Sequence, residues 1–239
     1  YLLNEKHELL DNKVKGMGLN FMLRYGLILE ELEIQVSGLY QNDQFTDMRS
    51  TIDTKYNRSN FKKFKIGAKY LVYDPYKNRD DGPNLYSYWA NNKFKWNSLI
   101  PAVSVYAGIN IDGENNPYTA PGIKGVSPIF TIATQNNFSN NFVLITNLIL
   151  ERIGTDQNDF EYITTLIYAI NSQWVSFIEA HGINSDFYAE NMLKFGAAYL
   201  SNENLQLDAS LIINFKDTPK IFYINFGGSY RFDLHKDSE

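Results

Sequence analysis

The 239-residue chain contains no cysteine, so it can build neither a disulfide framework nor a thiolate metal site. No stretch approaches the run of about 18 apolar residues that a membrane-spanning helix needs. The formal net charge of -5 at pH 7 argues against general binding to nucleic-acid phosphates, so no nucleic-acid partner is expected. Aromatic residues are plentiful, with 17 Tyr and 16 Phe. The mean hydropathy of -0.34 fits a soluble protein, but it also fits a membrane β-barrel, whose apolar residues alternate with polar ones.

Period-two alternation of apolar and polar residues recurs along nearly the whole chain. In the clearest segment, residues 204–215, Leu205, Leu207 and Leu211 alternate with polar residues. Such alternation predicts β-strands with two chemically different faces. Turn-forming Gly, Asn, Asp and Ser separate the segments. We predict twelve strands, near residues 1–6, 18–27, 30–41, 61–73, 99–110, 127–137, 141–152, 159–170, 173–184, 191–201, 204–214 and 220–232.

The predicted connections alternate in length. Tight turns at residues 26–31, 138–141, 171–173 and 202–203 alternate with polar loops at 42–60, 111–126, 153–158 and 185–190. Short turns on one rim and longer loops on the other are typical of an up-and-down transmembrane barrel. The sequence therefore predicts an all-β fold: one twelve-stranded antiparallel barrel that occupies residues 1–239.

Period two does not say which face of a barrel points outward. A soluble barrel places its apolar rows inside, and a membrane barrel places them against lipid. A twelve-stranded tube is wider than the roughly eight strands whose side chains fill the interior. Aromatic residues also lie near strand ends, where the girdles of membrane barrels are found. The last strand ends in Gly-Gly-Ser-Tyr-Arg-Phe, similar to the C-terminal assembly signal of outer-membrane barrels, with Gly228, Tyr230 and Phe232 as its residues. These features favour the membrane barrel.

Short motifs in a fixed order also resemble a known family, the outer-membrane barrels named for the meta-pathway of phenol degradation. The resemblance implies a twelve-stranded barrel in the outer membrane of a Gram-negative bacterium and a transport function. It covers nearly the whole chain. The motifs are Leu23-Arg24-Tyr25-Gly26-Leu27, Glu31-Leu32-Glu33, Gly67-Ala68-Lys69-Tyr70, Pro101-Ala102-Val103, Ser127-Pro128, Asn147-Leu148, Phe177-Ile178-Glu179, Asn204-Leu205-Gln206-Leu207-Asp208 and Ser229-Tyr230-Arg231-Phe232.

Two features depart from that family. The chain continues past Phe232, and the connection at about 74–98 is much longer than the short turn expected on its periplasmic rim. This insertion is rich in the aromatic residues that anchor protein interfaces. It is either a partial plug under the barrel or a docking surface. The docking candidates are Tyr76, Tyr86, Tyr88, Trp89, Phe94 and Trp96. A secretion signal is expected upstream of Tyr1.

With the apolar rows on lipid, the opposite rows must line the lumen. They carry both signs of charge in similar numbers, which predicts either a filled, ion-paired tube or a polar constriction for a solute. Arg24 is expected opposite Glu33 or Gln35, and Arg231 near Asp208. The predicted lumen-lining polar residues are Arg24, Glu33, Gln35, Lys65, Lys69, Asn147, Glu151, Glu179, Lys194, Gln206, Asp208 and Arg231.

Catalytic and metal-binding patterns are weak. His181 lies close in sequence to Glu179 and Ser176, but strand alternation places Ser176 on the other face, away from the hydrogen-bond contact that a Ser–His pair needs. The loop around Asp112 has oxygen ligands without the EF-hand spacing. The sequence therefore predicts no enzyme, no cofactor and no metal.

Two function classes remain. The first is an outer-membrane channel that passes small, aromatic or apolar solutes. The second is a non-conducting barrel that serves as a subunit or scaffold of a larger envelope complex and docks through the 74–98 insertion. The expected partners are outer-membrane lipid and lipopolysaccharide, and other envelope proteins in the second class.

Overall fold

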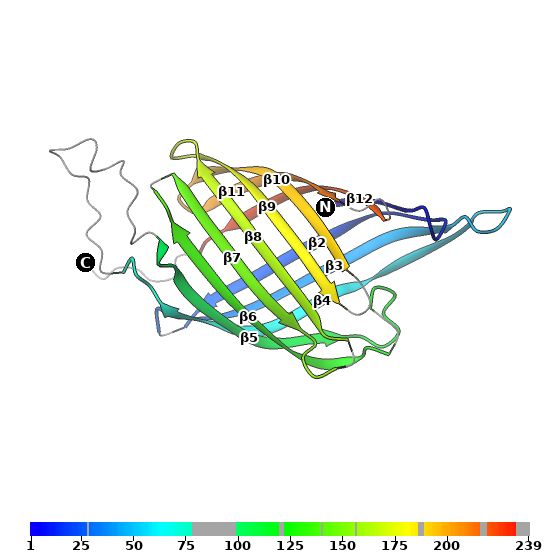
Figure 1. The fold of residues 1–239 in the computed structure, drawn as a ribbon, viewed down its shortest axis with the longest axis horizontal. Helices are drawn as coiled ribbons and strands as arrows, with labels where there is room; N and C mark the ends of the chain where they lie inside the picture. Colours follow the sequence, from blue (N-terminus) through cyan, green and yellow to red (C-terminus); the bar gives the residue numbers. More distant parts are fainter. Residues whose placement is uncertain are drawn as a thin grey trace.

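A computed structural model describes residues 1–27, 29–77, 99–119, 122–139, 141–155, 157–185, 189–215 and 219–232. Within these residues the strands form one closed barrel in which every strand pairs antiparallel with its neighbours in the chain, and β1 closes the ring by pairing with β12 (Figure 1). The strands are β1 (Leu2–His7), β2 (Asn12–Gly26), β3 (Leu32–Asp47), β4 (Thr54–Tyr73), β5 (Ala102–Asp112), β6 (Gly125–Asn137), β7 (Phe142–Glu151), β8 (Asp159–Ala169), β9 (Trp174–Ser185), β10 (Ala189–Asn202), β11 (Leu205–Asn214) and β12 (Lys220–Tyr230). The predicted all-β, twelve-stranded antiparallel barrel is confirmed.

The predicted loop at 42–60 is wrong. β3 continues to Asp47 and β4 begins at Thr54, so these residues form a long hairpin, and β2 also starts early, at Asn12. Figure 1 shows β2, β3 and β4 extending well past the other strands at one end of the barrel. Polar residues such as Asn42 and Gln44 occupy the outward face there. Alternation of apolar and polar residues is therefore lost, although the strands continue.

Burial in this barrel is the reverse of that in a water-soluble protein. Among the described residues only five apolar side chains are buried, whereas ten polar or charged ones are, including Glu151 and Glu190. Large apolar side chains lie on the outside: Leu23, for example, is 67 % exposed. Large apolar side chains that point outward in such numbers need a non-aqueous surrounding, because contact of apolar surface with water is unfavourable. The apolar rows therefore form the outer wall, and the charged rows face the lumen.

The apolar outer wall has a defined height. On β3 the outward residues run from Tyr40 through Val36 and Ile34 to Leu32, a span of nine residues. A strand of about 9–11 residues, tilted by about 45°, crosses the hydrocarbon core of a bilayer. Rings pack around Tyr40 on this wall, with Tyr40 and Phe61 centroids 5.4 Å apart and Phe61 and Phe64 centroids 5.6 Å apart. No helix in the described ranges is long and apolar enough to span a membrane.

Candidate functional site in the barrel lumen

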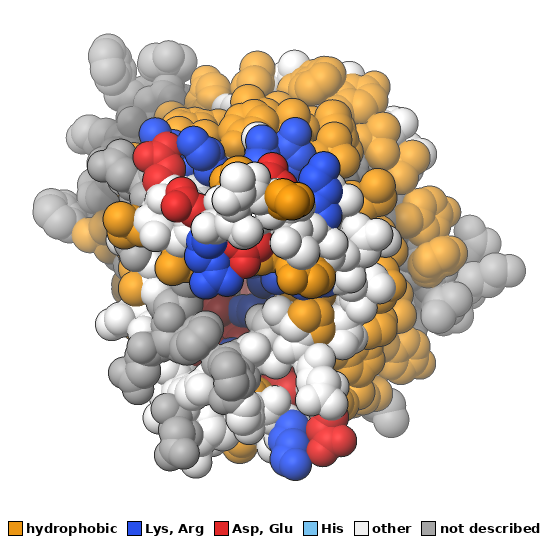
Figure 2. Space-filling view, turned by 90° about the vertical axis from the view of Figure 1, so that its right-hand side faces the viewer, with side chains coloured by type: hydrophobic (Ala, Val, Ile, Leu, Met, Phe, Trp, Pro, Cys, Tyr) orange, Lys and Arg blue, Asp and Glu red, His pale blue; other side chains and the backbone are white. Residues whose placement is uncertain are grey.

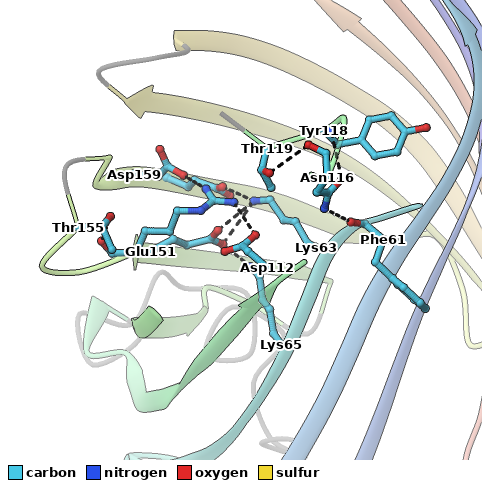
Figure 3. Close-up of polar contacts among 12 residues, drawn as sticks. Phe61, Lys63, Lys65, Asp112, Asn116, Tyr118, Thr119, Glu151, Thr155 and Asp159 are labelled. Atoms are coloured by element: carbon cyan, nitrogen blue, oxygen red, sulfur yellow. Dashed lines mark hydrogen bonds and ion pairs between the residues drawn. The ribbon is translucent and has the colours of Figure 1, made fainter. Parts of the chain in front are cut away.

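A cluster of four charged side chains crosses the lumen. Lys63 and Lys65 come from β4 and Glu151 from β7 (Figure 3). Glu161 comes from β8. Lys63 Nζ lies 2.5 Å from Glu161 Oε1 and 3.3 Å from Glu151 Oε2, and Lys65 Nζ also contacts Glu151 Oε1. Because β5 and β6 separate β4 from β7 in the wall, these contacts can only be made through the interior.

The two carboxylates of this lumen cluster are almost inaccessible: Glu151 is 1 % exposed and Glu161 4 %. His181 of β9 adds a fifth member, with its Nε2 atom 3.4 Å from Glu161 Oε2. Two lysines and two glutamates balance one another, as burial of charge requires. The lumen cluster (Lys63, Lys65, Glu151, Glu161 and His181) thus ties β4 to β7, β8 and β9.

A second ion group lies at the loop-side end of the lumen cluster. Arg152, directly after β7, contacts Asp159 of β8 and lies 3.4 Å from Asp112 of β5. The Asp112 side chain is only 5 % exposed. Its position next to Glu151 in sequence places Arg152 beside the lumen cluster, and Figure 3 shows Asp112 and Asp159 close to Lys63 and Glu151. The two groups together carry both signs of charge across one level of the tube.

The loop between β5 and β6 folds against the wall of β3 and β4. Asn116 Nδ2 donates to the backbone oxygen of Phe61 at 2.6 Å. The Tyr118 hydroxyl lies 3.0 Å from the backbone oxygen of Arg58 and 3.2 Å from that of Gln41. The Arg58 guanidinium sits over the Tyr118 ring at 5.3 Å from its centroid. The described part of this loop therefore lies over the lumen beside Lys63 rather than away from it (Figure 3).

Gly67 and Gly108 make room for the Tyr106 side chain on the lumen wall. A Cβ atom at Gly67 would come within 2.5 Å of the Ala107 backbone oxygen and 2.6 Å of the Tyr106 ring. We expect Gly67→Ala to destabilise the barrel by about 1–3 kcal/mol, because a backbone oxygen cannot move aside. Heat-modifiable gel mobility measures the effect. Gly113→Ala is the matched control, since a Cβ there meets nothing within 4 Å; equal stability of the two variants would contradict the close approach.

Four predicted lumen residues lie near the short-turn rim. Arg24 is opposite Gln35 in the β2–β3 register, as expected, and its Nε lies 3.2 Å from Met22 Sδ. Gln35 donates to Glu33, and Lys69 Nζ is 3.9 Å from Glu33 Oε1. This group is looser and more exposed than the lumen cluster.

The other predicted residues are spread around the wall. Glu179 accepts from Thr165 at 3.0 Å and lies 3.5 Å from Lys194. Asn147 has the strand parity of Glu151, and Gln206 has that of Asp208. The register does not place Arg231 opposite Asp208, as was expected. Asp208 lies opposite Gly227, and Arg231 follows the end of β12, where its backbone N–H donates to the backbone oxygen of Asn204.

Tyr76 is the one docking candidate among the described residues. Its hydroxyl accepts from the Asn137 backbone N–H at 2.9 Å, so it ties the chain after β4 to the end of β6. Beside it, Lys77 bonds Glu31 at 2.8 Å, and this hydrogen bond lowers the pKa of Glu31. Tyr86, Tyr88, Trp89, Phe94 and Trp96 lie outside the described residues.

The residues of the predicted assembly signal point outward. The Tyr230 and Phe232 rings stack edge to face, with centroids 4.7 Å apart, and Gly228 has the same strand parity.

Sequence reasoning missed several lumen residues. Lys63 has the same parity as Lys65 on β4, and Glu161 on β8 lies opposite Ile149, which has the parity of Glu151 on β7. Both residues lie within predicted strands, so alternation alone could have found them. Asp43 and Arg58 form an ion pair at 2.8 Å, but they lie in the segment that was predicted to be a loop. Glu190, fully buried, accepts from Asn214 Nδ2 at 3.1 Å.

The lumen cluster contains carboxylates, ammonium groups and one imidazole, that of His181. Ser176 has the opposite strand parity to His181, so the two do not form a nucleophile–base pair. Within the described ranges no group of three or more His, Asp or Glu could hold a metal ion. Charges of both signs at one level of a tube can set the charge preference of whatever passes.

Solved structures with a similar fold include a porin, an outer-membrane channel and the transport unit of an autotransporter. The NanC porin is 8 % identical, with a TM-score of 0.54 over 97 % of this chain and 98 % of that one. An outer-membrane channel from Pseudomonas putida F1 is 10 % identical, with a TM-score of 0.53 over 97 % and 93 %. The transport unit of the autotransporter AIDA-I from Escherichia coli is 10 % identical, with a TM-score of 0.56 over 97 % and 88 %. At these identities the likeness shows the fold: a barrel like those of outer-membrane channels.

Sequence comparison gives the family. No curated protein sequence gives a significant match to the chain. A family model matches residues 3–232, which is nearly all of the chain, and its description is "Putative MetA-pathway of phenol degradation". The resemblance seen in the short motifs is thereby confirmed, and the chain belongs to this family of barrel proteins.

Proposed function

We propose that the protein is a passive channel of the bacterial outer membrane, through which small solutes pass a charged constriction. The observation that carries this proposal is the lumen cluster, which places four charges of both signs across one level of a tube. Figure 2, a view onto one end of the barrel, shows polar and charged side chains around a hollow with acidic and basic side chains at its floor, bordered by the apolar outer wall. A polar entrance that leads to a charged constriction can select solutes by their charge.

The lumen wall also has an apolar side. Val143, Ile167 and Phe177 lie opposite one another on β7, β8 and β9, and they share the inward parity of Glu151, Glu161 and His181. Lys194 Nζ sits over the Phe177 ring, 5.3 Å from its centroid. An apolar strip beside mixed charges favours a small solute with an aromatic or aliphatic body and a polar group.

The charge of the cluster predicts opposite selectivity changes in two variants. Glu161→Gln leaves a net positive cluster and Lys65→Gln a net negative one. One unit charge at about 5 Å in water changes the energy of a passing ion by about 0.8 kcal/mol, or about fourfold in permeability. We expect reversal potentials in planar bilayers to shift towards anions for the first variant and towards cations for the second.

Solute flux into liposomes tests the proposal itself. Wild-type protein should pass small amphipathic solutes, and Lys124→Gln, a change at an exposed loop residue, should behave like wild type. Absence of conductance and of solute flux in the wild type would overturn the channel and leave the scaffold alternative. Shifts of the same sign in the two lumen variants would overturn the constriction.

A further inference from the structure

The outer wall carries a row of lysines above the apolar belt. Lys220 of β12 lies directly opposite Lys6 of β1, and Lys6 lies opposite Lys13 of β2. Lys13 faces Thr46 of β3, which in turn faces Lys55 of β4. Four lysines thus occupy one cross-strand row that runs over five adjacent strands.

All members of this row point away from the lumen. Leu3 and Val14 are buried inside, and Lys6, Lys13 and Lys15 have the opposite parity to them on their strands. Lys15 lies one outward position below Lys13, opposite Gln44. The outer lysine row is therefore Lys220, Lys6, Lys13 and Lys55, with Lys15 directly beneath it.

Like charges directly opposite each other repel in an antiparallel sheet. Glu8 compensates part of the row, since it lies 3.3 Å from Lys6 Nζ and 3.9 Å from Lys220 Nζ. Lys13, Lys15 and Lys55 have no acidic partner among the residues that the structure describes. The middle of the row thus has an excess of positive charge that calls for an external anion.

The surface below the row identifies the kind of anion. A hollow of about 440 Å³ lies on the outer wall, with Lys15, Asn42, Gln44, Asn57 and Ser59 among its lining residues. The next outward row below Asn42 and Ser59 holds Leu19, Tyr40 and Phe61, where the apolar belt begins. From bottom to top this face is apolar, then polar, then cationic.

The height of the row matches the headgroup layer of a membrane. Lys13 is six residues above Leu19 on β2. At about 3.3 Å per residue and a tilt of about 40°, it stands roughly 15 Å above the edge of the apolar belt. In Figure 2, lysines and arginines line part of the border between the polar end and the apolar wall.

We propose that this face binds a phosphorylated glycolipid of the outer leaflet. Its acyl chains would lie against the belt, its sugars in the polar hollow, and its phosphates on Lys13, Lys15 and Lys55. A cation at a membrane surface attracts anionic lipid by about a fivefold change in affinity. The site rests on the barrel spanning the membrane, but it shares no residue with the lumen constriction, so loss of conductance and loss of lipid binding are separate outcomes.

The test uses the full chain in an uncharged detergent, titrated with bisphosphorylated lipid A, with the same lipid after removal of its phosphates, and with inorganic phosphate. Native mass spectrometry counts the bound lipid. Wild type should prefer the phosphorylated lipid, and Lys13→Gln/Lys15→Gln should weaken its binding by about 25-fold, the product of two fivefold losses. Lys77→Gln/Lys124→Gln, which removes the same charge elsewhere, should bind like wild type, and Glu8→Gln should bind more tightly.

Three results would overturn the site. They are equal binding of lipid A to the Lys13/Lys15 variant and to wild type, equal binding of lipid A with and without its phosphates, and inorganic phosphate competing at the same concentration as lipid A. The last would show a site for a free anion. Gel mobility before and after heating verifies that each variant is folded.

Discussion

Glu151→Gln is expected to lower the free energy of unfolding of the barrel by about 3 kcal/mol. The Glu151 carboxylate is buried between Lys63 and Lys65, and the neutral amide would leave two ammonium groups facing Glu161 alone. Removing one partner of a buried ion pair costs about 3–5 kcal/mol. The lower end applies here because the Lys63 and Lys65 side chains are still 27 % and 17 % exposed to solvent.

Urea titration in lipid vesicles, followed by tryptophan fluorescence, measures this loss. Glu203→Gln, at an exposed turn between β10 and β11, is the matched control and should be neutral. The double variant Lys65→Met/Glu151→Gln removes one positive and one negative charge. It should recover most of the stability, because Lys65 no longer repels Lys63. A Glu151→Gln variant as stable as Glu203→Gln would show that the lumen cluster contributes nothing to the barrel.

Asn116→Ala/Tyr118→Ala is expected to release the β5–β6 loop from the lumen wall. The pair of substitutions removes the hydrogen bonds to Phe61, Arg58 and Gln41 and the contact of the Tyr118 ring with Arg58. The Tyr118 hydroxyl has one hydrogen for its two acceptors, so the pair of substitutions removes two hydrogen bonds in effect. At about 1 kcal/mol for each hydrogen bond and about 0.5–1 kcal/mol for the cation–π contact, the released state gains about 2.5–3 kcal/mol. That corresponds to a population of released loops about 70–150 times larger.

Single-channel recording checks this shift. The variant should show larger conductance steps or longer high-conductance dwell times than wild type. Glu114→Gln, a substitution in the same loop whose exposed side chain pairs with Lys124, should leave the recordings unchanged. Recordings of the double variant that match wild type would mean that the loop does not limit the path.

Alternation carried most of the fold prediction. Each strand from β5 to β12 was located to within about three residues. In the membrane-spanning part of a strand the lipid-facing side chains must be apolar whereas the lumen-facing ones can be polar, so alternation marks where the strand runs. The same rule identified Lys65 and Glu151 as inward residues. It could not pair them, since parity gives a face but not a position around the ring, and their contact joins strands separated by two others.

Apart from Lys63 and Glu161, the features that were missed lie where alternation of apolar and polar residues has no physical cause. Asp43 and Arg58 form an ion pair above the apolar belt, where water replaces lipid and both faces of β3 and β4 can be polar. Tyr118 belongs to a loop, whose contacts depend on the closed barrel bringing β3 and β4 within reach. The outer lysine row needs the register of five strands, which no single segment encodes.

Because the strands differ in length, the loop-side rim of the barrel is higher on one side than on the other. β3 has 16 residues and β4 has 20, whereas β7 has 10 and β8 has 11, so one side of the wall stands tall and the other is low. On the low side the inward residues nearest the loop-side rim are Glu151 and Asp159, which lie opposite each other at the ends of β7 and β8, whereas the apolar strip of Val143, Ile167 and Phe177 lies near the short-turn rim. In the proposed channel, a solute that arrives over the low side therefore meets carboxylates before it reaches the apolar strip.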